Sequence, residues 1–346
     1  LCDKALVCRK WARLFDETMT DLRFSFQGSE VTVADVLNRM TDSDPGVREA
    51  AGVALSAGLK SRMRVFALVL NTIAKDKEIE DKKRGFVRPM SSRNIANRVE
   101  DEVVDALAGA VTGNYARLAH RYYAFKADWF GVEKLHWWDR NAPIPTTEER
   151  RFSWDEARET VLNAYAGFTP DMATTAKRFF DGSWIDAEAR PGKNSGAFAH
   201  PVVPSAHPYV LMNFYGKPRD VMTLAHELGH GVHQVLAAEQ GPLLSDTPLT
   251  LAETASVFGE MLTFRAILDG EPDAAKRRVL LAGKVEDMLN TVVRQIAFHT
   301  FETQVHDARR KGELTSEAIS DIWLATQSES LGPHIQLDDS YRTLWS

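Results

Sequence analysis

The residues best suited to chemistry lie in a five-residue motif, His-Glu-Leu-Gly-His, at positions 226–230. In a helix each residue advances about 100°, so His226 and His230 lie about 40° apart on one face. Both imidazoles can then reach one zinc ion, and Glu227 projects beside them, near the coordination position left for water. Zinc lowers the pKa of bound water toward neutrality, and a neighbouring carboxylate can take the proton. This spacing predicts a hydrolytic site with one Zn²⁺ per chain and Glu227 as general base.

A catalytic zinc site of this kind needs a third protein ligand. The metzincin pattern would place Gly and His where this chain has His233 and Leu236, so that class is excluded. The remaining option is a glutamate from a following helix. Glu253 and Glu260 are seven residues apart, which puts them about 20° apart on one helix face. One carboxylate can bind zinc while the other holds a ligand histidine in place, and we assign these roles to Glu253 and Glu260 respectively.

A helix from about 220 to 239 must position the motif. Asp220 can cap its start, and the Gly-Pro pair at 241–242 ends it. Gly229 and Gly231 each cost about 1 kcal/mol relative to alanine inside a helix, so we expect another segment to pack closely there. Apolar residues on the side of the helical wheel away from the histidines predict a buried stripe: Val221, Leu224, Leu228, Val232, Val235 and Leu236.

His233 lies on the metal face of the same predicted helix, about 20° from His226. It can support the metal site, or it can be an ordinary surface polar residue. We keep it as a candidate supporting residue, with both interpretations open.

A β-rich run at 209–215 precedes this helix and is bounded by Pro208 and Gly216. Such a strand can offer its edge to an extended peptide and present the scissile carbonyl to the metal. We therefore expect Tyr209 and Asn213 to line a substrate cleft, with core packing as the alternative for each. The helix carrying the two glutamates should run from about 250 to 269, and its apolar flanks should be buried: Leu251, Ala252, Ala255, Val257 and Phe258.

Helical periodicity dominates the rest of the chain, so the predicted fold is mostly α with a small β-sheet. Ser153 and Glu156 form a capping box that starts a helix. The turn-rich connector at 139–151 contains two prolines. We therefore divide the chain into an N-terminal helical portion, 1–140, and a catalytic portion, 141–346. Further helices are expected at about 32–74, 91–111, 114–131, 274–310 and 315–328.

Composition excludes several other classes of protein. The chain has 346 residues, 44% of them hydrophobic, and a net charge of −6, which argues against a nucleic-acid-binding surface. No uninterrupted apolar stretch is long enough for a membrane span or a signal peptide. Cys2 and Cys8, the two cysteines, cannot staple a chain of this length, which suits the reducing cytoplasm. Oligomeric state is not readable from these features.

Three longer motifs resemble the oligoendopeptidase F type of the thimet-oligopeptidase-like zinc peptidases, peptidase family M3. They are TLAHELGHGVHQ (223–234), AETASVFGEML (252–262) and HPYVLMNFYGKPRDV (207–221), with weaker similarity in SGAF (195–198) and RQIAFHTFE (294–302). The resemblance implies a zincin-like helical core with a deep cleft, and cytoplasmic cleavage of short, unstructured peptides.

By that likeness, His226 and His230 match the zinc histidines, Glu227 the general base and Glu253 the third ligand, while Glu260 matches a supporting carboxylate. Family members are longer, and after the equivalent of YRTLWS (341–346) they continue into a Tyr- and His-rich segment that stabilises the oxyanion. The resemblance thus implies a chain truncated at both ends and a weaker catalyst.

Two alternatives to an oligopeptide-cleaving endopeptidase follow from the same motifs. One is a zinc metallocarboxypeptidase of related helical architecture, which would need a free substrate C-terminus. The other is a zinc- and peptide-binding fragment with little turnover, although the presence of Glu227 argues against a degenerate site.

Overall fold

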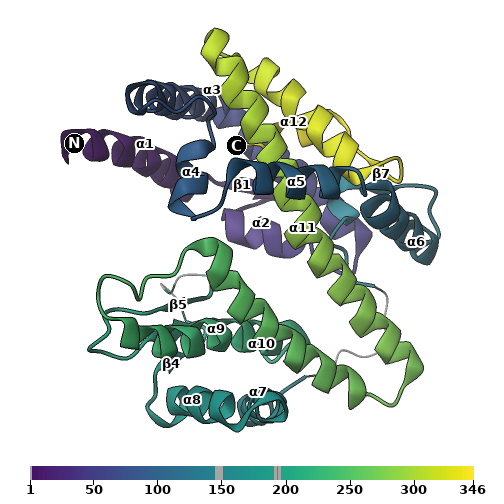
Figure 1. Cartoon of the computed structure of the whole chain (residues 1–346). Coiled ribbons are helices and arrows are strands. Elements are labelled where there is room, and N and C mark those ends of the chain that lie inside the picture. Colours follow the sequence, from purple (N-terminus) through teal and green to yellow (C-terminus); the bar gives the residue numbers. More distant parts are fainter. Residues whose placement is uncertain (1, 145–150, 191–192, 194–195) are drawn as a thin grey trace. The chain divides into compact units, whose positions relative to one another are not determined.

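The computed structural model describes residues 2–144, 151–190, 193 and 196–346; the side chains of residues 1–9, including Cys2 and Cys8, lie outside that description. Helices dominate (Figure 1), so the expectation of a mostly α fold with small sheets is confirmed. The helices are α1 (Cys2–Asp21), α2 (Val33–Arg39), α3 (Pro45–Arg84), α4 (Ser91–Ala96), α5 (Asp101–Thr112), α6 (Arg121–Phe130), α7 (Trp154–Phe168), α8 (Pro170–Asp181), α9 (Pro218–Ala237), α10 (Leu249–Asp269), α11 (Ala274–Lys311) and α12 (Ser316–Leu331).

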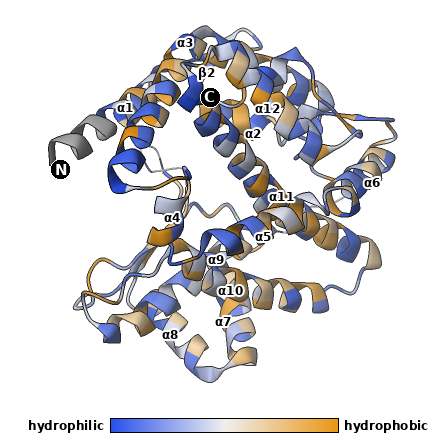
Figure 2. Cartoon of the chain, turned by 45° about the horizontal axis from the view of Figure 1, so that its top comes forward, coloured by the Kyte–Doolittle hydropathy of each residue, from blue (hydrophilic) through white to orange (hydrophobic). Residues whose placement is uncertain are grey.

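Short helical turns and strands connect these helices. The turns are η1 (Ala116–His120), η2 (Trp137–Asp139), η3 (Ala238–Gln240) and η4 (Asp339–Thr343). The strands are β1 (Phe24–Phe26), β2 (Ser29–Val31), β3 (Leu135–His136), β4 (Ile185–Asp186), β5 (Phe198–His200), β6 (Tyr209–Leu211) and β7 (Ile335–Gln336). Apolar and polar residues mix along the helices, as expected of amphipathic segments (Figure 2). Across the described residues, no helix combines the length and apolarity that a bilayer crossing requires.

The chain forms two compact units. Unit 1 comprises Leu1–Ile95, Val99–Pro145 and Ala282–Ser346, and unit 2 comprises Ala96–Arg98 and Thr146–Leu281. The first boundary is near the expected residue 140, but residues 282–346 belong with the N-terminal unit, unlike our division into two consecutive portions. The physical reason is packing: α12 and η4 contact α3 and share one core with the tryptophans of η2.

Unit 1 is built around α3. Asp44 caps this helix by accepting a hydrogen bond from the N–H of Gly46, and Gly85 ends it with a φ of +79°. The helix expected across 32–74 is thus two helices, and α3 continues through the charged run 75–84. Two small pairs of strands complete the unit, an antiparallel β1–β2 pair and a parallel β3–β7 pair.

Unit 2 contains α7 to α10 and a three-stranded sheet. The capping box predicted at Ser153 and Glu156 is confirmed at the start of α7. The strand order is β4-β6-β5, with β6 parallel to β4 and antiparallel to β5. Because β6 is the central strand, residues 209–211 are paired with neighbouring strands, and for these residues the expectation of a free edge for a peptide is wrong. The core includes Val161, Tyr165, Phe179, Val210, Leu224 and Leu228.

Candidate metal centre

Helix α9 carries the His-Glu-Leu-Gly-His motif. It begins at Pro218, with Lys217 rather than Asp220 at the N-cap position. Asp220 lies one turn inside, where its carboxylate accepts backbone hydrogen bonds from Lys217 at 3.0 Å and Tyr215 at 2.8 Å. The carboxylate therefore stabilises the helix start as expected, but from a different position.

One face of α9 is buried against the core of unit 2. Val221, Leu224 and Leu228 have no exposed surface, and Val232 is 7% exposed, as the predicted stripe requires. Leu236 is 61% exposed, so its inclusion in the stripe was wrong. Leu236 lies in the last turn of α9, where the core of unit 2 no longer covers the helix.

The two glycines in the motif region permit close packing, and that expectation is confirmed. A Cβ at Gly229 would lie 2.7 Å from the carbonyl oxygen of Ala255 and 2.7 Å from the Cα of Ser256, both on α10. A Cβ at Gly231 would lie 2.6 Å from the ring of Phe179. The backbone of α10 thus lies directly against α9 beside the two histidines.

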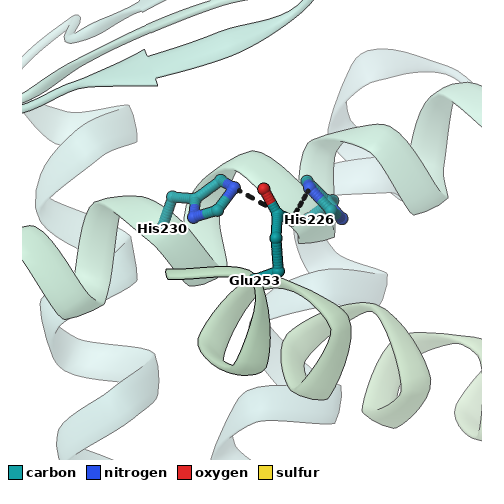
Figure 3. Close-up of side chains that lie close together, drawn as sticks. All are labelled: His226, His230 and Glu253. Atoms are coloured by element: carbon teal, nitrogen blue, oxygen red, sulfur yellow. Dashed lines mark ion pairs between the residues drawn. The ribbon is translucent and has the colours of Figure 1, made fainter. Parts of the chain in front are cut away.

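This contact brings Glu253 of α10 to the two histidines of α9 (Figure 3). The Oε2 atom of Glu253 lies 3.2 Å from His226 Nε2 and 3.6 Å from His230 Nε2. Among the described residues, these three form the one group of histidines, cysteines and acids with ligand atoms clustered for a metal, all within 4.8 Å. Two imidazoles and one carboxylate, with Glu253 half exposed, fit the donor set of an open catalytic zinc site.

Glu260 lies behind His226. Its Oε2 atom is 3.2 Å from His226 Nδ1, and its side chain is only 12% exposed. Because Nδ1 is paired with this carboxylate, the other ring nitrogen, Nε2, points to Glu253. Burial opposes protonation of His226, but the hydrogen bond to Glu260 and the neighbouring carboxylates outweigh it and raise the pKa.

Glu227 is held inside the protein beside the ligand group. It is 6% exposed, and its Oε2 atom is buried with no hydrogen-bond partner in the described part of the chain. The backbone N–H of Ala199 on β5 hydrogen-bonds its carboxylate, and Gln234 donates to the carbonyl of Ala199 at 3.3 Å. Burial is the main cause that raises the pKa of Glu227 to about 7. A buried carboxylate oxygen that has no hydrogen-bond partner and lies beside three candidate metal ligands is suited to accept a proton.

Three predicted site residues lie in unit 2 without joining the ligand group. His233 is half-buried on α9, and burial, followed by the proximity of His226 and then of His233, lowers the pKa of His230. Tyr209 is 49% exposed on β6 and packs against the ring of His207. Asn213 donates to the carbonyl of Gly196 at 3.2 Å. Their roles at the site stay predictions.

The apolar flanks of Glu253 differ from expectation. Leu251, Val257 and Phe258 are 57%, 40% and 41% exposed, whereas Ser256 and Gly259 are buried. The prediction of buried apolar flanks was wrong for these three residues, because α10 turns its small residues toward α9; Ala252 and Ala255 are half-buried. Close contact between the helices needs small side chains rather than large ones.

Sequence reasoning missed two residues that hold the site. Ser256 donates to the Oε2 atom of Glu253 at 2.9 Å, and its i,i+3 spacing could have revealed this. Tyr165 of α7 donates to the carbonyl of Ala225, the residue before His226, at 2.5 Å. No local signal points to that contact, because Tyr165 lies sixty residues upstream.

The model of peptidase family M3 matches residues 39–346. The chain belongs to this family. It is 28% identical over 296 residues to an oligoendopeptidase F homolog of Lactococcus lactis, covering 85% of this chain and 49% of that protein. It is 24% identical over 319 residues to oligopeptidase PepF of Bacillus subtilis, covering 92% and 47% respectively. The chain thus spans about half the length of the curated relatives it matches.

Solved structures share the fold of this M3 peptidase chain. Oligoendopeptidase-F from Enterococcus faecium superposes with a TM-score of 0.69 at 22% identity, over 98% of this chain and 55% of that one. PZ peptidase A in complex with an inhibitor gives a TM-score of 0.79 at 19% identity, over 97% of this chain and 61% of that one. The resemblance noted from the motifs is confirmed at the level of family and fold.

Proposed function

We propose that this chain is the core of a zinc-dependent endopeptidase that hydrolyses peptide bonds in short, unstructured oligopeptides in the cytoplasm. The observation that carries the proposal is the convergence of His226, His230 and Glu253 beside the buried carboxylate of Glu227. The family match and the names of the relatives, oligoendopeptidase F and oligopeptidase, support the reaction and the substrate class.

Each side chain has a distinct task in this proposal. His226, His230 and Glu253 hold the ion, while Glu260 keeps the His226 ring in the tautomer whose Nε2 can coordinate. A bound zinc ion supplies a Lewis acid that makes water acidic near neutral pH and polarises a carbonyl. Glu227 accepts the proton from the attacking water and can pass it to the leaving amine.

Strand β5 is the sheet edge associated with the site. Its residue Ala199 contacts α9 through both backbone groups, one with Glu227 and one with Gln234. The first contact links the general base to the sheet, and the second holds α9 against the same residue. We therefore assign β5, rather than the central strand β6, to the positioning of Glu227.

A metal assay paired with peptide digestion tests the proposal. The zinc content of the purified chain should approach one ion per chain, and peptides blocked at both ends should be cleaved internally in a mixed pool. Glu227→Gln serves as the matched control, because it keeps the shape of the side chain and removes the base. A chain that binds no zinc, or that acts only on peptides with a free C-terminus, would rule out the endopeptidase.

A further inference from the structure

Tyr165 of α7 is a buried residue at the place where the two helices of the candidate metal centre meet. Its side chain has no exposed surface and belongs to the core of unit 2, and α7 packs against both α9 and α10. The Tyr165 hydroxyl donates to the carbonyl oxygen of Ala225, which is also fully buried, at 2.5 Å. A buried tyrosine needs a hydrogen-bond partner for its hydroxyl, and here that partner directly precedes the zinc motif.

The bond to Ala225 restrains the backbone of His226. The carbonyl oxygen of Ala225 and the Cα atom of His226 belong to the same peptide unit, and that unit is planar. A carbonyl oxygen has two lone pairs, so Ala225 can accept from Tyr165 in addition to its bond within the helix. A hydrogen bond from outside α9 therefore restricts the tilt of this peptide plane, and with it the direction in which the His226 side chain leaves the helix.

The ring of Tyr165 also packs against α10, at Gly259. A Cβ at Gly259 would lie 2.9 Å from Cζ of Tyr165 and 3.2 Å from the carbonyl oxygen of Ala225, so a larger residue would displace the ring. Thr263, which has no exposed surface, donates to the carbonyl oxygen of Gly259 at 3.1 Å. Because the Cα atoms of Gly259 and Glu260 share one peptide unit, the position of the ring restrains where the Glu260 side chain begins.

One side chain thus contacts the residue before His226 and the residue before Glu260. These two residues form the pair that supports the metal centre, with 3.2 Å between His226 Nδ1 and Glu260 Oε2. Burial, followed by the nearby charge of Glu260, raises the pKa of Tyr165, so the hydroxyl keeps the proton that it donates. The phenol of Tyr165 therefore acts as a spacer between α9 and α10 at this pair.

We propose that Tyr165 is a positioning residue for the metal centre. Its hydroxyl holds the backbone at Ala225, and its ring holds the backbone at Gly259. Glu260 then reaches Nδ1 of His226 and leaves Nε2 directed at the ion. Without the hydroxyl, the peptide unit before His226 gains freedom, and the bond to Glu260 is held less tightly. The inference rests on the proposed function, because it assigns Tyr165 a part in the same site.

Tyr165→Phe tests this role, because it removes the hydroxyl and keeps the ring. The zinc affinity of the full chain, measured against a competing chelator, should fall by about tenfold, as for other residues that orient a metal ligand. The visible absorption spectrum of the Co²⁺-loaded chain should also change, since its bands depend on the geometry of the ligands.

Val161→Ala is the matched control. Val161 lies one turn earlier on α7, has no exposed surface and belongs to the same core. Its truncation should lower the midpoint of urea unfolding, because it leaves a cavity in the core. The zinc affinity and the Co²⁺ spectrum should stay those of the parent chain, since the hydroxyl of Tyr165 is retained.

A double-mutant cycle with Glu260→Ala separates positioning of the pair from a general effect on packing. Tyr165→Phe should weaken zinc binding less in Glu260→Ala than in the parent chain, because the pair that it positions is already broken. An unchanged zinc affinity or Co²⁺ spectrum in Tyr165→Phe, an equal loss of affinity in Val161→Ala, or additive losses in the cycle would overturn this inference alone. A parent chain that binds no zinc would refute the proposed function, and this inference with it.

Discussion

Replacing Gly229 by alanine should weaken metal binding without touching any ligand. The added Cβ would lie 2.7 Å from two backbone atoms of α10, and ordinary contact begins at 3.4 Å, so α10 must retreat by about 0.7 Å. No side-chain rotation can relieve this clash, because both opposing atoms belong to the backbone. The retreat moves Glu253 away from His226 and His230, to which its Oε2 atom is now 3.2 and 3.6 Å distant.

Two energies of opposite sign set the expected size of the effect. Overpacking a well-packed contact costs about 1–3 kcal/mol, while alanine in place of glycine within a helix stabilises by about 1 kcal/mol. The free energy of unfolding should therefore fall by up to about 2 kcal/mol. Loss of a residue that orients a metal ligand typically weakens metal affinity by about ten- to a hundredfold. Displacement of the ligand Glu253 itself should weaken the zinc affinity by at least the same factor.

Gly283→Ala is the matched control. Gly283 lies within α11, and a Cβ there would meet nothing within 4 Å. The free energy of unfolding of this variant should rise by about 1 kcal/mol, and its zinc affinity should not change. Zinc titration with a competing chelator and urea unfolding measure both quantities in both variants. If Gly229→Ala binds zinc as tightly as the parent chain, the close approach of α10 does not position Glu253 and the reasoning is refuted.

The other predictions concern the site itself. Glu253→Ala should lose most of its zinc, whereas Glu260→Ala should keep more; the reverse order in metal analysis would mean that Glu260 is the ligand. Glu227→Gln should retain zinc and lose hydrolysis by about two to four orders of magnitude, and turnover near the parent's rate would exclude it as the base. Ser256→Ala should weaken zinc binding by about tenfold, because Glu253 loses its hydrogen-bond donor; an unchanged affinity in the chelator titration would contradict this.

Much of the candidate site could be predicted from local spacing. His226 and His230 one turn apart, and Glu253 and Glu260 two turns apart, follow from helical geometry alone once each segment is recognised as a helix. The mid-helix Gly229 predicted a close neighbour because glycine there has an energetic cost. Such inferences succeed because the residues involved are neighbours on one helix, so their relative positions depend on the backbone period and on nothing distant.

Tertiary packing decided what spacing could not. The run at 209–215 was recognised as β-rich, but its central place in the sheet depends on pairing with β4 and β5. The exposure of Leu236 depends on which neighbours reach the last turn of α9, and no pattern within the helix encodes this.

The same holds at longer range. Residues 282–346 return to the N-terminal unit because η4 shares a core with Trp137, about two hundred residues away along the chain. Tyr165 reaches the carbonyl before His226 only when α7 packs on α9. Contacts of this kind depend on the shapes and buried areas of several elements at once, so the sequence determined the chemistry of the site, and the fold decided what holds it in place.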